Sequence, residues 1–471
     1  MEKALGAIWP YVWCFVFSIF IFSMPVFSLL PLSWHNQQRV GQIFLIVLAT
    51  VWCLTSKEKS RLGFVPTVLL LGVGGLAIVS CARASQSLWA FTEFALFVGC
   101  CSIVYAVKGL RERYGRRADF CILGLLVAIV VGLLLKFIVS YISAAFLRGP
   151  IDSLLLFDGF SWPRFLGQFQ TLSLPLLILP ALIGSRWSGW SILLCTVWWF
   201  ATIAAGTRAS WLGMASVVFI IPFLFRDGKR FSLLQVACFL VGLLGYKIFM
   251  DMVPWVLGLS TGNLAEDRLS FSMSGREVLW AAAWSIFLEH PWLGAGPMHF
   301  AEIAHPFGAH PHQALLQWMS EWGGVSTLLV FLLLGRGVWM FYQGAMRTQS
   351  EDASLAALKV CLMASFVASA VHAMFDGSLV MPYTQTWLAI LIGWAWGIHA
   401  DQQCHVQGRR LLFQSLLSLF ASLLLVYVAV RDIPRIMDAS ARGQPVTTCW
   451  REAPRFWYNG IIKEKPKDGC P

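Results

Sequence analysis

The chain has 471 residues, of which 58% are hydrophobic and only 13% are charged. A soluble globular domain carries about a quarter charged residues, so this composition excludes an ordinary water-soluble protein. The formal net charge of +11 would suit a nucleic-acid-binding protein, but the positive residues lie in short gaps between apolar runs, as in the cytoplasmic loops of membrane proteins. We therefore expect an all-α membrane protein that binds membrane lipids and no nucleic acid.

Apolar runs of about 17–25 residues, the length that crosses a bilayer as a helix, recur along the chain. The first one follows Met-Glu-Lys, is too long for the core of a signal peptide, and is interpreted as a retained span. We expect about 12–13 transmembrane helices. In chain order they cover 8–30, 40–55, 64–82, 87–107, 119–146, 167–184, 189–206, 209–225, 232–250, 322–345, 354–375, 379–398 and 411–430.

Three basic clusters set the expected orientation, because lysine and arginine concentrate on the cytoplasmic side. They lie at 57–61, 108–117 and 226–230. With these inside, the N-terminus is cytoplasmic and the gaps 31–39, 83–86, 147–166, 207–208, 251–321 and 376–378 are external. Residues 1–430 then form one transmembrane domain, and 431–471 form a polar tail that we expect outside. Cys449 and Cys470 of this tail could form a disulfide there.

The gap 251–321 is the longest polar stretch and includes a helix-like piece from about Gly275 to Glu289. Long loops between compact spans are usually functional. His305, His310 and His312 lie within eight residues near its end, and helical spacing begins at His312. A helix N-terminus favours a neutral histidine able to accept a proton. The alternatives are histidines that only order the loop, or a zinc site.

Three arginines on the external side are candidates for binding phosphate: Arg164, Arg208 and Arg276. Arg208 lies between two apolar runs, where a charge is costly and by default suggests a function. The planar guanidinium suits phosphate oxygens. Each arginine could instead reach the membrane surface or pair with an internal carboxylate.

Asp376 occupies another external turn, in an Asp-Gly pair. It could pair with an arginine, orient a catalytic histidine, or simply form the turn. A set of tryptophans crowds the same regions and could bind sugar rings or anchor helices at the interface. They are Trp280, Trp284, Trp292, Trp318 and Trp322.

At these residues the sequence resembles the O-antigen ligase-like superfamily, which includes lipopolysaccharide O-antigen ligases, O-antigen polymerases and pilin O-oligosaccharyltransferases. The resemblance covers about 160–390 and rests on the order of several motifs. They lie at 206–210, 275–280, 290–296 and 312–323. It implies a multi-pass enzyme of the bacterial inner membrane that moves a glycan from undecaprenyl diphosphate to a hydroxyl, with no cofactor or metal.

The resemblance also implies roles for individual residues. His312 would be the general base, and Arg208 and Arg276 would hold the diphosphate with support from Arg164 and Gln168. His310, Gln313 and Asp376 would support the site, although Gln313 stands where the family usually has asparagine.

The acceptor implied first is a pilin, because the stretches around Arg164 and His310 look like the pilin-type enzymes. The lipid A-core of an O-antigen ligase and a polymerase activity are the alternatives. A transporter is the rival from a different class, but charges gathered at one face do not favour it.

Overall fold

The structure is a computed structural model that describes residues 2–28, 30–56, 63–262, 264–267, 275–303, 308–348, 352–400, 412–441 and 455–458. These residues are almost entirely helical. The first half contains α1 (Glu2–Val26), α2 (Trp34–Thr55), α3 (Phe64–Arg83), α4 (Ser87–Tyr114), α5 (Arg116–Phe146), α6 (Ser153–Leu156), α7 (Pro163–Leu177), α8 (Leu179–Leu182), α9 (Ser188–Ala204), α10 (Arg208–Leu224) and α11 (Gly228–Tyr246). The second half contains the π-helix η1 (Lys247–Met252), α12 (Val253–Leu257), α13 (Leu264–Asp267), α14 (Arg276–Glu289), α15 (His299–Glu302), α16 (Ala314–Thr348), α17 (Ala353–Ala373), α18 (Pro382–Ala400) and α19 (Leu412–Ala441).

The fold class predicted from composition is confirmed. Among the described residues, nine helices are long and apolar enough to cross a membrane, and three shorter apolar helical stretches accompany them. α18 covers the remaining predicted span and begins with polar residues such as Thr384 and Gln385. The described strands are only β1 (Ile151–Asp152) and β2 (Thr261–Gly262), which pair in parallel with Ile151 opposite Thr261.

Several span boundaries were wrong because polar residues continue the helices. α2 begins at Trp34 rather than at residue 40. In its first turns His35, Asn36 and Arg39 are buried, and each forms a hydrogen bond inside the protein. α19 continues past the predicted end at 430 to Ala441. The basic stretch 108–117 is also helical: α4 runs through it and passes to α5 at Gly115, whose φ of 56° favours glycine.

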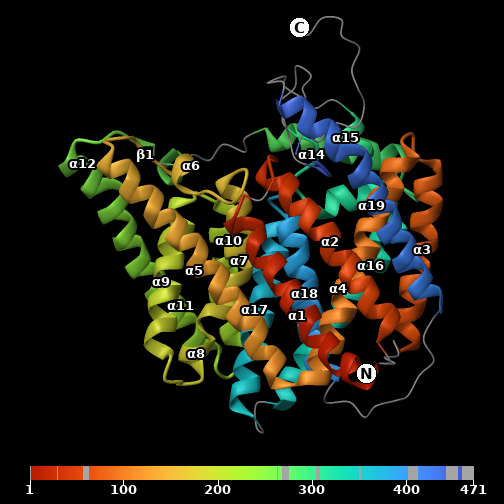
Figure 1. The fold of residues 1–471 in the computed structure, drawn as a ribbon, viewed down its shortest axis with the longest axis horizontal. Coiled ribbons are helices and arrows are strands. Elements are labelled where there is room, and N and C mark those ends of the chain that lie inside the picture. The colour runs from red at the N-terminus through yellow and green to blue at the C-terminus, as the bar shows by residue number, and fades with distance from the viewer. Residues whose placement is uncertain are drawn as a thin grey trace, which may run out of the picture.

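The segments predicted as external gather at one edge of the bundle. Along the upper edge in Figure 1 lie α6, α12, α14, α15 and β1, and α19 also ends there. By contrast, α1 begins at the lower edge, at about the height of α8. The predicted loop 251–321 is not a plain loop, because its described parts form η1 from Lys247, α12, β2, α13, α14 and α15. Basic residues at 57–61 lie outside the described residues, and the orientation across a membrane stays a prediction.

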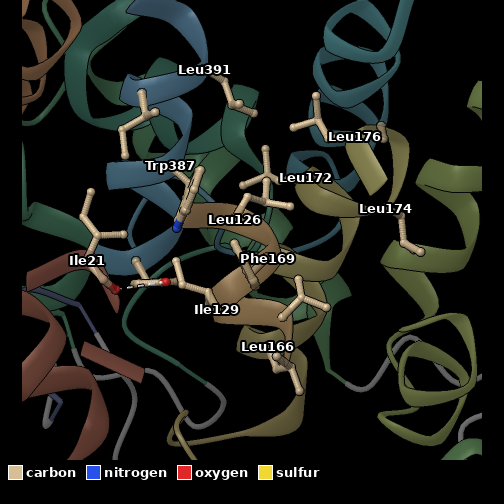
Figure 2. Close-up of a cluster of buried hydrophobic side chains, with 14 of the residues drawn as sticks. Ile21, Leu126, Ile129, Leu166, Phe169, Leu172, Leu174, Leu176, Trp387 and Leu391 are labelled. Carbon is tan, nitrogen blue, oxygen red and sulfur yellow. Dashed lines mark hydrogen bonds between the residues drawn. The ribbon is translucent and has the colours of Figure 1, made fainter. Parts of the chain in front are cut away.

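The centre of the bundle is α7, whose side chains are almost all buried. Figure 2 shows Leu166, Phe169 and Leu172 of α7 among Leu126 and Ile129 of α5 and Trp387 of α18. The rings of Phe169 and Trp387 lie 5.6 Å apart. Helical spacing puts Arg164, Gln168 and Thr171 along a different face from Phe169. This buried central helix therefore carries a polar row toward the upper edge.

Candidate active site

His312 lies in a tight turn immediately before α16. Its φ of 53° is in the left-handed region, which is unusual for a residue other than glycine and is often found at functional sites. The carbonyl oxygen of the Gln313 side chain accepts a hydrogen bond from the backbone N–H of Leu316, so Gln313 caps the helix. The indole of Trp280, on α14, donates to the carbonyl oxygen of Pro311 at 3.0 Å. The turn is thus held from both sides.

The imidazole of His312 contacts a buried carboxylate. Its Nδ1 lies 3.2 Å from Oδ1 of Asp376, and only 6% and 2% of the two side chains are exposed. The backbone N–H of Gly377 donates to the same carboxylate oxygen at 2.7 Å. Of the alternatives that the sequence left open for Asp376, the structure combines two, since this residue forms the turn and also contacts the histidine. Nδ1 then carries the proton, which leaves Nε2 as the basic nitrogen.

A second histidine, which the sequence reasoning missed, contacts the other oxygen of Asp376. Nε2 of His372 lies 3.5 Å from Oδ2, and its Nδ1 lies 2.9 Å from the hydroxyl of Thr171 on α7. His372 and Asp376 are four residues apart, so the His-x-x-x-Asp spacing at the end of α17 was the signal that could have identified it. Asp376 therefore lies between two imidazoles.

His310 packs against His312 and is completely buried. Its Nδ1 accepts the backbone N–H of His312 at 3.3 Å, and the two ring centroids are 4.0 Å apart. A Cβ on Gly377 would come within 2.2 Å of the His310 ring, which explains the glycine after Asp376. The structure thus places His310 as a support that shapes the turn around His312.

Two of the three predicted arginines act electrostatically on His312. Arg164, in the first turn of α7, and Arg276, the first residue of α14, are the cations with the strongest effect on its pKa. Arg208 is the first residue of α10 and is partly buried. Gly206, two residues before it, packs closely on Leu264 of α13. Arg208 is not one of the main charges acting on the histidine.

Burial is the largest influence on His312 and lowers its pKa below the ordinary value, because the charged imidazolium loses its hydration. The hydrogen bond to Asp376 opposes this shift, and the positive charges of Arg164 and Arg276 add to it. Burial alone would raise the pKa of Asp376, but the hydrogen bond from His312, the adjacent imidazole of His372 and the charge of Arg164 lower it. At neutral pH the pair is therefore a neutral imidazole on a carboxylate.

Several buried polar atoms around this pair have no hydrogen-bond partner among the described residues. They are Nε2 of His310, Nε2 of His372, Nε2 of Gln168, Oγ of Ser378 and Oγ1 of Thr207. Gln168 uses only its oxygen, which accepts from the hydroxyl of Thr384 at 2.8 Å. Unsatisfied buried polar atoms are rare in folded proteins and call for an explanation. Here they belong to segments that also carry the predicted site residues.

The other predicted residues are the tryptophans, the possible metal ligands and the cysteines of the tail. Trp318 and Trp322 stack on each other at 5.3 Å and pack against Phe97, so they are structural. Trp284 and Trp292 are exposed. No group of three metal-ligating side chains is found within the described ranges. His305, Cys449 and Cys470 lie outside those ranges.

The structure defines a multi-pass helical membrane protein with a buried histidine–aspartate pair and flanking arginines at one edge of the bundle. Residues 191–332 match a family model described as O-antigen ligase. This match confirms the resemblance stated above: the chain carries an O-antigen ligase-like domain, of the kind found in membrane enzymes that transfer lipid-linked glycans. A comparison of the chain with curated proteins found no match. The matched region contains Arg208, Arg276 and His312, whereas Arg164 and Asp376 lie beyond its two ends.

Proposed function

We propose that this protein transfers a glycan from undecaprenyl diphosphate to an acceptor hydroxyl at the periplasmic face of the bacterial inner membrane. The observation that carries the proposal is the buried contact of His312 with Asp376, 3.2 Å between Nδ1 and Oδ1. The charges of Arg164 and Arg276 act on the same imidazole. A neutral base beside fixed cations suits a reaction in which a hydroxyl is deprotonated and a diphosphate leaves.

In the proposed reaction, Nε2 of His312 takes the proton of the acceptor hydroxyl while its oxygen attacks the anomeric carbon of the donor. The new C–O bond forms as the bond to the diphosphate breaks, and undecaprenyl diphosphate leaves with the electron pair. Asp376 stabilises the imidazolium that forms, as carboxylates do in other histidine-based sites. Arg164, Arg208 and Arg276 would stabilise the negative charge on the diphosphate, and no metal is required in this scheme.

We favour a pilin as the acceptor, because the stretches around Arg164 and His310 are most similar to the pilin-type oligosaccharyltransferases. The lipid A-core is the second candidate, and the O-antigen ligase description of the matching family favours it. A polymerase acting on a second lipid-linked glycan uses the same chemistry with another acceptor. A transporter is less well supported, because the arginines and histidines gather at one edge and not along a path through the bundle.

The test is expression in a bacterial host that makes an undecaprenyl-linked glycan and lacks its own ligase, followed by blotting of pilin and lipopolysaccharide for the added sugar. The wild-type chain should modify one of them. Arg208→Lys should be severely impaired, because a point charge cannot replace the bidentate guanidinium. His399→Ala, at the far end of α18, is the matched control and should transfer normally. Unmodified pilin and lipopolysaccharide in cells with inserted wild-type protein would contradict both acceptor assignments.

A further inference from the structure

A short segment near the C-terminus, Arg455–Tyr458, packs deep in the upper edge of the bundle. Arg455 and Phe456 are each 1% exposed. The carbonyl oxygen of Phe456 accepts hydrogen bonds from Nε of Arg39 at 3.0 Å and from the ring of His35 at 3.2 Å. The indole of Trp457 donates to Asp432 on α19 at 2.9 Å. We call residues 455–458 the C-terminal clasp.

The guanidinium of Arg455 forms the centre of a buried charge cluster. Its Nη2 lies 2.6 Å from Oε2 of Glu321 and 3.6 Å from Oε1 of Glu93, and the side chains of Arg455 and Glu321 are fully buried. No other ion pair to Glu321 is seen in the described parts of the chain. A buried carboxylate without a counter-charge is strongly destabilising. The clasp therefore supplies a charge that the interior of the bundle requires.

Glu321 connects this charge to the segment that precedes the His312 turn. Its Oε1 accepts the backbone N–H of Phe300 at 3.1 Å, and its carbonyl oxygen accepts that of Gly296 at 3.1 Å. Residues 294–302, including α15, are thus fastened to α16. The sequence continues from there toward His310 and His312, which belong to the same external loop.

Arg39 connects the clasp to the other half of the site. Besides the clasp carbonyls, its Nη2 donates to the carbonyl oxygen of Val380 at 2.7 Å. The backbone N–H of Val380 in turn bonds to the carbonyl of Gly377 at 3.0 Å, in the turn that carries Asp376. The clasp is thus linked through Glu321 to the segment before His312, and through Arg39 to the turn of Asp376.

We infer that the C-terminal clasp positions the active site. Arg455 is a positioning residue that, by neutralising Glu321, holds the segment before His312, while the clasp carbonyls, through Arg39, hold the turn of Asp376. The catalytic half of this statement rests on the proposed function. The structural half is independent of it, because Glu321, Phe300 and Arg455 are in contact whatever the reaction. Arg455 lies 134 residues from Glu321 in the chain.

The experiment compares Arg455→Met with Arg435→Met, an exposed arginine of α19, in the full-length protein. Hydrogen exchange of peptides covering 294–302 is measured first, because it needs neither donor nor acceptor. Arg455→Met should speed exchange there and lower kcat by roughly 10–100-fold at an unchanged KM for the donor, since small displacements of a site have such effects. Arg435→Met should change neither quantity.

A rescue variant separates positioning by charge from simple loss of packing. Arg455→Met combined with Glu321→Gln removes the unpaired carboxylate but keeps an acceptor for Phe300, so it should recover slow exchange and most of kcat. The double variant also carries the test if Arg455→Met alone does not accumulate. Wild-type exchange and kcat in Arg455→Met, or no recovery in the double variant, would overturn the inference. Changed exchange in a protein whose wild type transfers no glycan would support the clasp and refute only the proposed function.

Discussion

Two buried polar clusters at opposite edges of the bundle look alike in composition but differ in how they are satisfied. At the lower edge, Arg111 and Asp119 are 2.6 Å apart and Trp394 donates to the same carboxylate. Lys108 pairs with Glu112 at 2.6 Å. These interactions join α4, α5 and α18, and each charge has a protein partner.

At the upper edge, the cluster around Asp376 leaves polar atoms of His310, His372 and Ser378 without a hydrogen-bond partner among the described residues. The turn of His312 also has a left-handed backbone. In a buried polar network that serves only to stabilise the fold, we expect every polar group to have a partner, as at the lower edge. Burial of charge therefore does not by itself mark a site, whereas unpartnered polar atoms and a left-handed backbone occur together at the upper edge.

Among substitutions in the two clusters, Asp376→Asn should have the largest effect on the rate of glycan transfer. Replacing the carboxylate should lower kcat by about 10²–10⁴-fold, because the amide supports the wrong tautomer and stabilises the imidazolium poorly. Since Asp376 raises the pKa of His312, its loss should move the acid limb of the pH–rate profile to lower pH. A profile measured with the purified variant checks both; an acid limb displaced to higher pH would contradict the assignment.

Arg164→Gln should change the rate less than Asp376→Asn does, and it should shift the pKa of His312 in the opposite direction. The positive charge of Arg164 lowers the pKa of His312, so its removal should raise that pKa and move the acid limb to higher pH. The rate at the plateau should also fall, by at most about 10²–10³-fold, because one donor to the diphosphate is lost. The same rate measurements at several pH values test this prediction, and an unchanged acid limb would show that the charge does not act on the base.

The smallest effect on rate is expected at the lower edge. Arg111→Met leaves Asp119 without its cation and should destabilise the protein by about 3–5 kcal/mol, seen as a lower thermal midpoint in detergent. The rate per folded molecule should not change. An Arg111→Met variant with wild-type stability but a reduced rate of glycan transfer would contradict the assignment of the lower-edge cluster to stability and the upper-edge cluster to catalysis.

Much of this fold followed from the sequence because hydrophobic length and helical periodicity are local properties. Each predicted span corresponds to a helix, and errors arose where polar residues such as Arg39 and Lys108 are buried within a helix. The loop histidines and the three arginines also stood out, since charges beside apolar runs are conspicuous.

The pairing of these residues could not be predicted in the same way. His312 and Asp376 are 64 residues apart, and Thr171 and His372 are 201 residues apart. Such contacts depend on how α7, α16 and α17 pack, which no local spacing encodes. His372 was therefore missed, and the role of Arg455 was invisible within a polar tail.

The most direct test of the central claim is a transfer assay with purified protein, an undecaprenyl-diphosphate-linked glycan and the acceptor found in cells. Wild-type protein should transfer the glycan, and His312→Ala should lower the rate by roughly 10²–10⁴-fold while the variant still folds and inserts into the membrane. A folded His312→Ala variant that transfers glycan at the wild-type rate would contradict the assignment of this imidazole as the base.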